Sequence, residues 1–159
     1  MKPPAQRGFT LVELVVTVAI VGLLASAALP LAELGYRRAH EQELRAALRQ
    51  VRDAIDAYKS AADAGRIAVA PGTSGYPPSL SVLVDGVEDV RSPEHRLIFF
   101  LRRVPRDPLF PDTAAPAEDT WGYRAYDSPP DNPAPGADVF DVYSLSPAQG
   151  INGVPYREW

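Results

Sequence analysis

The chain has 159 residues, of which 20 are acidic and 16 are basic, and its formal net charge is -4. The basic residues are not gathered into one strongly basic block, which argues against nucleic acid as a partner. The absence of cysteine excludes disulfides, thiolate metal sites and a cysteine nucleophile.

The first element is a short basic segment followed by a long apolar run. Lys2 and Arg7 lie in the basic segment, and residues 14–32 then form a stretch of 19 uncharged residues. A helix of that length spans about 30 Å, the thickness of a hydrocarbon core. The order of basic and then apolar residues keeps an N-terminus in the cytoplasm. A cleaved secretory signal ending in residues 25–30 is the alternative, although the run is long for that class.

Glu13 lies immediately before the uncharged run. An unpaired carboxylate in lipid costs several kcal/mol, so we expect Glu13 to meet a cation. The alternative is that Glu13 lies near the lipid headgroups and reaches them at small cost.

The residues around Glu13 resemble a known N-terminal motif. Gly8-Phe9-Thr10-Leu11-Val12-Glu13, followed by an apolar run, is similar to the class III leader and mature start of type IV pilins and type II secretion pseudopilins. The resemblance implies that a prepilin peptidase/methyltransferase cleaves between Gly8 and Phe9 and methylates the new amino group of Phe9. It also implies that Glu13 pairs with the N-terminal ammonium of Phe9 in a neighbouring subunit during assembly. Residues 1–8 would then be a cleaved leader peptide, and residues 9–34 a transmembrane and fibre-core helix.

Gly22 and Pro30 interrupt this helix. Pro30 lacks a backbone N–H and its ring clashes with the preceding turn, which predicts a kink or a loosened turn at residues 26–30. The resemblance associates a proline near this place with a locally melted segment in assembled fibres. A static kink in a membrane helix is the alternative.

An amphipathic stalk helix is predicted over residues 35–65. Its apolar residues recur at spacings of four and three and would line one face: Leu44, Leu48, Val51, Ile55, Tyr58 and Ala62. Charged residues between them could form the i,i+4 ion pairs Glu41–Arg45, Arg49–Asp53 and Arg52–Asp56. Gly65 suits a left-handed cap that ends the helix. A coiled coil would need more heptads, so we expect the stripe to pack on the chain's own head.

Residues 66–159 predict a small globular head. Residues 66–79 form a loop, and residues 79–84 form a short helix capped by Ser79 and ended at Asp85 and Gly86. The apolar run at residues 97–101 is assigned to the head core. Residues 120–126 and 138–146 alternate between apolar and polar, which predicts an antiparallel pair of strands on the stalk helix. The predicted fold class is therefore α+β.

The head extends the resemblance towards the major pseudopilin of type II secretion. The similar segments are "GYPPSLSVLV", "LRRVPRDPL", "WGYRAY" and "FDVYSLS". The resemblance implies a pilin-like fold and a structural subunit that polymerises as a helical homopolymer to drive exoprotein export. Its implied partners are other pseudopilins, an inner-membrane assembly platform and membrane lipid. It also implies a single-pass inner-membrane protein with a cytoplasmic N-terminus and an extracytoplasmic head.

One loop departs from the family pattern. Major pseudopilins carry a sequence like S-L-G-A-D-G that binds calcium, whereas residues 144–150 here place Ala148 where that aspartate is expected. Calcium prefers six to eight oxygen ligands, carboxylates among them, so the loop is a poor site and we expect no metal or other cofactor. The nearby acids Asp127, Asp131, Asp138 and Asp141 are interpreted as turn residues.

The sequence contains no catalytic constellation. His40 and His95 are expected at the surface, and Asp107 is expected to stabilise a turn rather than to act in chemistry. A minor type IV or competence pilin that binds DNA or a surface is the alternative function, with Arg102, Arg103 and Arg106 as its compact basic feature. A membrane-tethered domain that never polymerises is a third hypothesis.

Overall fold

The computed structural model describes residues 8–159, so the first seven residues of the predicted leader lie outside the described residues. The long helix α1 spans Leu11–Asp63. The chain divides into two compact units, the first ending at Ala39 and the second comprising His40–Trp159. Helix α1 contributes to both units, and each unit is described by itself.

In the first unit, residues 14–32 of α1 carry no charge, and the large apolar side chains of the helix are exposed. Those exposed by half or more include Leu11, Val12, Leu14, Val15, Val18, Ile20, Val21, Leu23, Leu24 and Leu31. The helix continues through Gly22 and Pro30. Because Pro30 has no N–H to donate, the carbonyl of Ser26 lacks its usual helical partner.

In the second unit, α1 buries one stripe of side chains. The stripe predicted from the 3.6-residue period is confirmed, because Leu44, Leu48, Val51, Ile55 and Tyr58 are buried and Ala62 is partly buried. Residues that pack in the same core come from all parts of the head and include Leu80, Leu83, Leu101, Trp121, Val142 and Tyr156. This half of α1 is therefore the central element of the head core.

Helix α1 ends in a left-handed turn at Gly65, as its sequence predicts. The φ angle of Gly65 is +65°. Its N–H donates to the carbonyl of Ala62 at 2.8 Å, and the N–H of Arg66 donates to the carbonyl of Ala61 at 2.9 Å. These two bonds form a Schellman motif, which satisfies the last carbonyls of the helix.

The short helix α2 spans Leu80–Asp85 and buries Leu80 and Leu83. Ser79 occupies its N-cap position, but its side chain makes no capping hydrogen bond. The prediction that Ser79 caps the helix through its side chain is therefore wrong, because its hydroxyl pairs instead with the hydroxyl of Ser81 at 2.8 Å.

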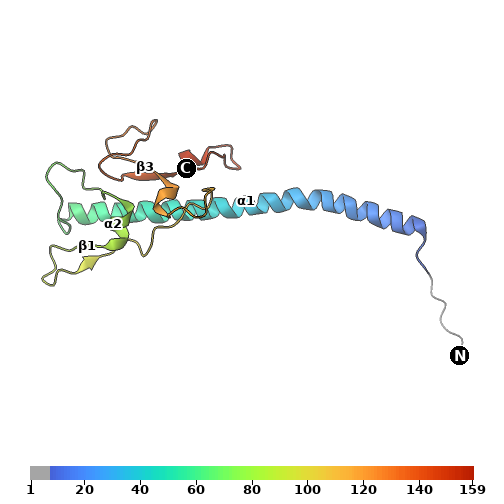
Figure 1. Ribbon diagram of the computed structural model, residues 1–159, viewed down its shortest axis with the longest axis horizontal. Helices are drawn as coiled ribbons and strands as arrows, with labels where there is room; N and C mark the ends of the chain where they lie inside the picture. The colour runs from blue at the N-terminus through green and yellow to red at the C-terminus, as the bar shows by residue number, and fades with distance from the viewer. Residues whose placement is uncertain (1–7) are drawn as a thin grey trace, which may run out of the picture. The chain divides into compact units, whose positions relative to one another are not determined.

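Two separate antiparallel strand pairs complete the second unit. Strand β1 (Val87–Glu88) pairs with β2 (Leu97–Ile98), and β3 (Trp121–Arg124) pairs with β4 (Asp141–Ser144). Two 3-10 turns, η1 (Glu118–Thr120) and η2 (Tyr156–Glu158), flank the second pair in sequence. Figure 1 shows β1 and β3 on opposite sides of the carboxyl-terminal part of α1. The predicted α+β fold class and the predicted β3–β4 pairing are confirmed.

The apolar run at residues 97–101 is only partly core. Leu101 is buried and Ile98 is partly buried, whereas Leu97 and Phe99 are 52% and 61% exposed. The assignment of the whole run to the core is wrong, because alternate side chains of an extended segment point to opposite faces. Phe99 lies against Gly86, where any Cβ would approach its ring to 2.7 Å.

Candidate functional site: the N-terminal segment and the head that holds α1

Thr10 and Glu13 close the start of α1 with reciprocal hydrogen bonds. The N–H and the hydroxyl of Thr10 donate to Glu13 Oε2 at 2.8 and 2.9 Å, and the N–H of Glu13 donates to Thr10 Oγ1 at 3.2 Å. This arrangement is a capping box, which satisfies backbone donors that the first turn of a helix leaves free. The capping role of Thr10 is not among the sequence predictions, although the spacing T-x-x-E before an apolar run is the signal for such a cap.

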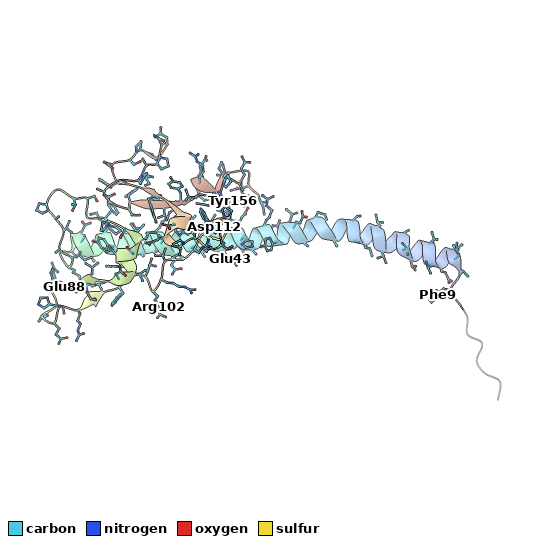
Figure 2. All side chains as sticks on the ribbon, in the orientation of Figure 1. Phe9, Glu43, Glu88, Arg102, Asp112 and Tyr156 are labelled. Carbon is cyan, nitrogen blue, oxygen red and sulfur yellow. The ribbon has the colours of Figure 1, made fainter. Side chains whose placement is uncertain are left out.

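Phe9 precedes the cap and lies outside any packed core. Its side chain is 86% exposed, and Figure 2 labels it at the beginning of α1. Gly8 is exposed too and has no atom within 4 Å of a Cβ built on it. The peptide bond between Gly8 and Phe9 therefore lies in an exposed segment, outside any helix or strand, just before α1.

The polar side chains within the apolar run are satisfied inside the helix. Thr17 Oγ1 donates to the carbonyl of Leu14 at 2.9 Å, and Ser26 Oγ donates to the carbonyl of Leu23 at 2.7 Å. Hydroxyls bonded in this way carry no unsatisfied donor into an apolar environment. Helix α1 is long and apolar enough to cross a membrane, and its most apolar window is not buried by the rest of the described chain.

Residues 3–29 match the family model described as the prokaryotic N-terminal methylation motif. A comparison with curated proteins and one with solved structures found no match. The match supports a type IV pilin-like protein with an apolar helix suited to membrane anchoring. A motif of this kind implies processing by a prepilin peptidase and pilus-like polymerisation, and it is typical of structural subunits rather than of enzymes.

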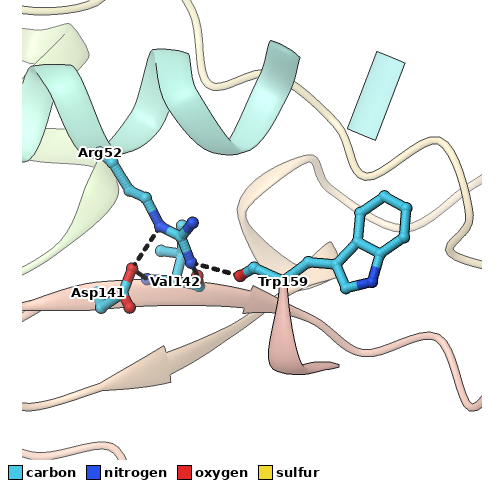
Figure 3. Close-up of polar contacts among 4 residues, drawn as sticks. All are labelled: Arg52, Asp141, Val142 and Trp159. Atoms are coloured by element: carbon cyan, nitrogen blue, oxygen red, sulfur yellow. Dashed lines mark hydrogen bonds and ion pairs between the residues drawn. The ribbon is translucent and has the colours of Figure 1, made fainter. Parts of the chain in front are cut away.

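Arg52 joins α1 to strand β4. Its Nε donates to Asp141 Oδ1 at 2.8 Å, and its Nη2 donates to the main-chain oxygens of Val142 and Trp159 at 3.1 and 2.7 Å (Figure 3). The predicted i,i+4 pair of Arg52 with Asp56 is therefore wrong. The guanidinium is half-buried and its planar fork matches three acceptors at once, which a helical neighbour cannot offer.

Glu41, nearer the start of the second unit, joins α1 to the C-terminal residues of the head. It is buried, and its Oε1 accepts the N–H of Ile151 at 2.7 Å and the hydroxyl of Tyr156 at 3.0 Å. Its predicted pairing with Arg45 is wrong, since Arg45 stacks on the ring of Trp159 with its Cζ 4.3 Å from the centroid. Within the described residues, Arg49 and Asp53 likewise form no ion pair.

Asp107 holds the loop after β4. It is fully buried, and its Oδ2 accepts the hydroxyl of Ser144 at 2.5 Å while its Oδ1 accepts the N–H of Leu109 at 2.8 Å. The hydroxyl of Ser144 in turn accepts the N–H of Ser146 at 3.1 Å. Burial raises the pKa of the Asp107 carboxyl, and these hydrogen bonds oppose that rise. The predicted turn-stabilising role of Asp107 is confirmed.

Two of the four carboxylates predicted to be turn residues, Asp138 and Asp141, bind other groups of the head. Asp138 Oδ1 accepts the N–H of Tyr126 at 2.8 Å, and Asp138 Oδ2 also accepts the hydroxyl of Ser74. Asp141 is bound by Arg52, as described above. Residues 8–159 contain no group of three or more His, Cys, Asp or Glu side chains arranged to hold a metal ion, and Ala148 is exposed.

The histidines differ from one another. His95 is exposed, as its sequence context predicts, and it contacts Glu88. His40 is half-buried, which corrects its expected surface position, and its Nδ1 lies 3.5 Å from Glu43 Oε2. Arg106 binds the main-chain oxygens of Ala115 and Asp112, which positions its side chain.

Proposed function

We propose that this chain is a structural subunit of the pseudopilus of a type II protein secretion system. Cleavage between Gly8 and Phe9 and methylation of the new amino group produce the mature subunit. The observation that carries the proposal is an apolar helical surface, beginning at Leu11, that the described chain leaves uncovered and that largely coincides with the methylation motif at residues 3–29.

Two environments bury this surface in turn. Before assembly, residues 9–34 cross the inner membrane, where the lipid tails cover the apolar side chains. In the filament, the same side chains pack against the helices of neighbouring copies. The helix thus moves from one apolar environment to another without exposure to water, and Gly22 and Pro30 are the positions at which it bends.

Glu13 sets the alignment of neighbouring subunits in this proposal. After cleavage, the amino group of Phe9 is a cation four residues before Glu13. Thr10 holds the carboxylate through Oε2, and among the described residues Oε1 has no partner, so Oε1 is available to the ammonium of a neighbouring copy. A buried ion pair specifies the alignment of two chains more dependably than it adds net stability. Alignment of neighbouring subunits is the role proposed for Glu13.

The order of segments in the head supports the pseudopilin branch over an adhesive or DNA-binding pilin. In the described head, the segment around Asp107 binds Ser144 of β4, and β4 in turn accepts a hydrogen bond from Arg52 of α1. The subunit would lie in the inner membrane with its N-terminus in the cytoplasm and its head outside. Its partners would be further copies of itself, other pseudopilins, the processing enzyme and the inner-membrane assembly platform.

The experiment compares Glu13→Val with the matched control Glu33→Val in the native host. Both variants remove one acid from the same helix, and both should insert into the membrane. Glu13→Val should lower filament yield by roughly tenfold or more, because breaking a buried ion pair costs about 3–5 kcal/mol. Glu33→Val should assemble like the wild type. Filament yield is measured by shearing and immunoblotting, and secretion by the amount of exported enzyme in the medium.

Two results would contradict the proposal. Normal filaments from Glu13→Val would refute the role of Glu13. Unchanged export in a strain that lacks the chain would refute the assignment to secretion.

A further inference from the structure

A basic groove runs between α1 and the last residues of the chain. It has a volume of about 350 Å³, and its lining includes Arg45, Arg49, Arg52, Glu158 and Trp159. The three arginines come from one face of α1 and are separated by four and three residues. All of these residues belong to the second unit, so the groove is a feature of the head alone.

Two of the three guanidiniums in the groove are not neutralised. Arg52 is paired with Asp141. Arg45 is held against the ring of Trp159, which fixes its position but adds no negative charge. In the described part of the chain, neither Arg49 nor Glu158 forms an ion pair. The groove therefore holds two guanidiniums without an ion-pair partner, those of Arg45 and Arg49, beside the side-chain carboxylate of Glu158.

A preformed acidic loop lies elsewhere on the head. It is the connection from β3 to β4, residues 125–140, which carries three acids and no base. This loop exposes Asp127 and Asp131, and Figure 1 shows the connection from β3 to β4 standing away from α1. Its backbone is restricted by prolines at positions 129, 130, 133 and 135.

Hydrogen bonds inside the acidic loop add to its rigidity. The hydroxyl of Ser128 donates to the carbonyl of Asn132 at 3.3 Å and accepts the N–H of Ala134 at 2.8 Å. The N–H of Ala125 donates to the carbonyl of Ala134 at 3.0 Å. A loop that is already ordered loses little conformational entropy when it binds.

We propose that the groove formed by Arg45 and Arg49 receives the acidic loop of a second copy of this chain, with Asp127 and Asp131 as the groups that it binds. Charge complementarity selects this occupant, because the loop presents carboxylates where the groove presents unpaired guanidiniums. Groove and loop are different surfaces of one head, so the contact is heterologous and can extend from copy to copy. This inference rests on the proposed filament and adds a contact between heads that does not involve Glu13.

The test is a charge exchange in the full chain, with filament yield as the readout. Arg45→Glu/Arg49→Glu should lower the yield about tenfold, and so should Asp127→Arg/Asp131→Arg. The chain carrying all four changes should recover to within about twofold of the wild type, because the reversed charges again attract. The control, Arg157→Glu with Asp119→Arg, reverses two exposed charges outside both surfaces and should leave the yield unchanged. Thermal unfolding of each variant, followed by circular dichroism, reports whether the head remains folded.

Each outcome separates this inference from the proposed function. If the wild type assembles and Arg45→Glu/Arg49→Glu assembles equally well, the groove contact is refuted and the filament stands. If both charge reversals fail and the fourfold variant does not recover, the loop is not the occupant and the groove binds another acidic partner. If the wild type itself forms no filament, both proposals fail.

Discussion

The two halves of α1 belong to one helix but meet different surroundings. Residues 11–34 are apolar around the circumference and expose their large side chains, whereas residues 44–61 are apolar along one stripe and bury it in the head. Helix formation is common to both, so the pattern of apolar residues decides what each half packs against. A stripe can be covered by the chain's own small head, whereas a fully apolar helix needs a membrane or other molecules around it.

The largest expected change in stability comes from replacing one leucine by alanine in each half of α1. Leu44→Ala should destabilise the head by about 2–5 kcal/mol, because Leu44 is fully buried and the change leaves a cavity in the core. Leu14→Ala should leave the unfolding of the head unchanged, because Leu14 is 60% exposed in its own unit. The measurement is thermal unfolding of the full chain in detergent, followed by the near-ultraviolet dichroism of its two tryptophans. Equal destabilisation by the two variants would contradict the claim that only the second half of α1 is buried in the head.

Asp107→Ala tests the hydrogen bonds that hold the sheet side of the core. The change leaves the hydroxyl of Ser144 and the N–H of Leu109 without their acceptor in a buried place. The head should lose about 1–3 kcal/mol, which is the usual cost of unsatisfied buried donors. Denaturant unfolding measures the loss, and a stability equal to the wild type would show that water or nearby groups replace the carboxylate.

Arg52→Ala tests the polar link between the second half of α1 and strand β4. The guanidinium makes three hydrogen bonds but is about one-third exposed, so solvent reduces their worth and we expect a loss of about 1–2 kcal/mol. Arg49→Ala is the matched control on the same helix and should change stability by less than about 0.5 kcal/mol. Denaturant unfolding again provides the comparison, and equal losses from both variants would contradict the assigned role of Arg52.

The smallest expected effect is a pH dependence from Asp107. Burial raises the pKa of its carboxyl above the ordinary 3.8, so the folded chain binds a proton more readily than the unfolded chain does. Its contribution to stability is therefore fully present below pH 3.8 and decreases as the pH rises through the raised pKa. The difference in unfolding free energy between the wild type and Asp107→Asn should change in that direction over this interval. A difference that does not vary with pH would contradict the raised pKa.

The features that the sequence predicted well depend on local pattern. The stripe from Leu44 to Ala62 follows helical periodicity, and the end of α1 follows from the tolerance of Gly65 for a left-handed conformation. The pairing of β3 with β4 follows from alternation in two short segments. The cap formed by Thr10 and Glu13 has a local signal as well, the spacing T-x-x-E before an apolar run.

The features that the sequence did not predict depend on contacts between distant residues. Glu41 and Arg52 have helical neighbours of opposite charge, yet they bind groups 89 or more residues away in the sequence. The sequence did not predict which residues of the run 97–101 belong to the core, because composition does not say which of the alternating side chains face inward. Strand β1 has only two residues, which is too short for a pattern.

We propose that the chain leaves the apolar part of α1 uncovered because lipid and neighbouring subunits cover it, and that the mature subunit begins at Phe9. Intact mass spectrometry of the protein extracted from its native membrane tests this claim most directly. We predict the mass of residues 9–159 carrying one added methyl group. A mass that corresponds to the complete, unmethylated chain would contradict the claim.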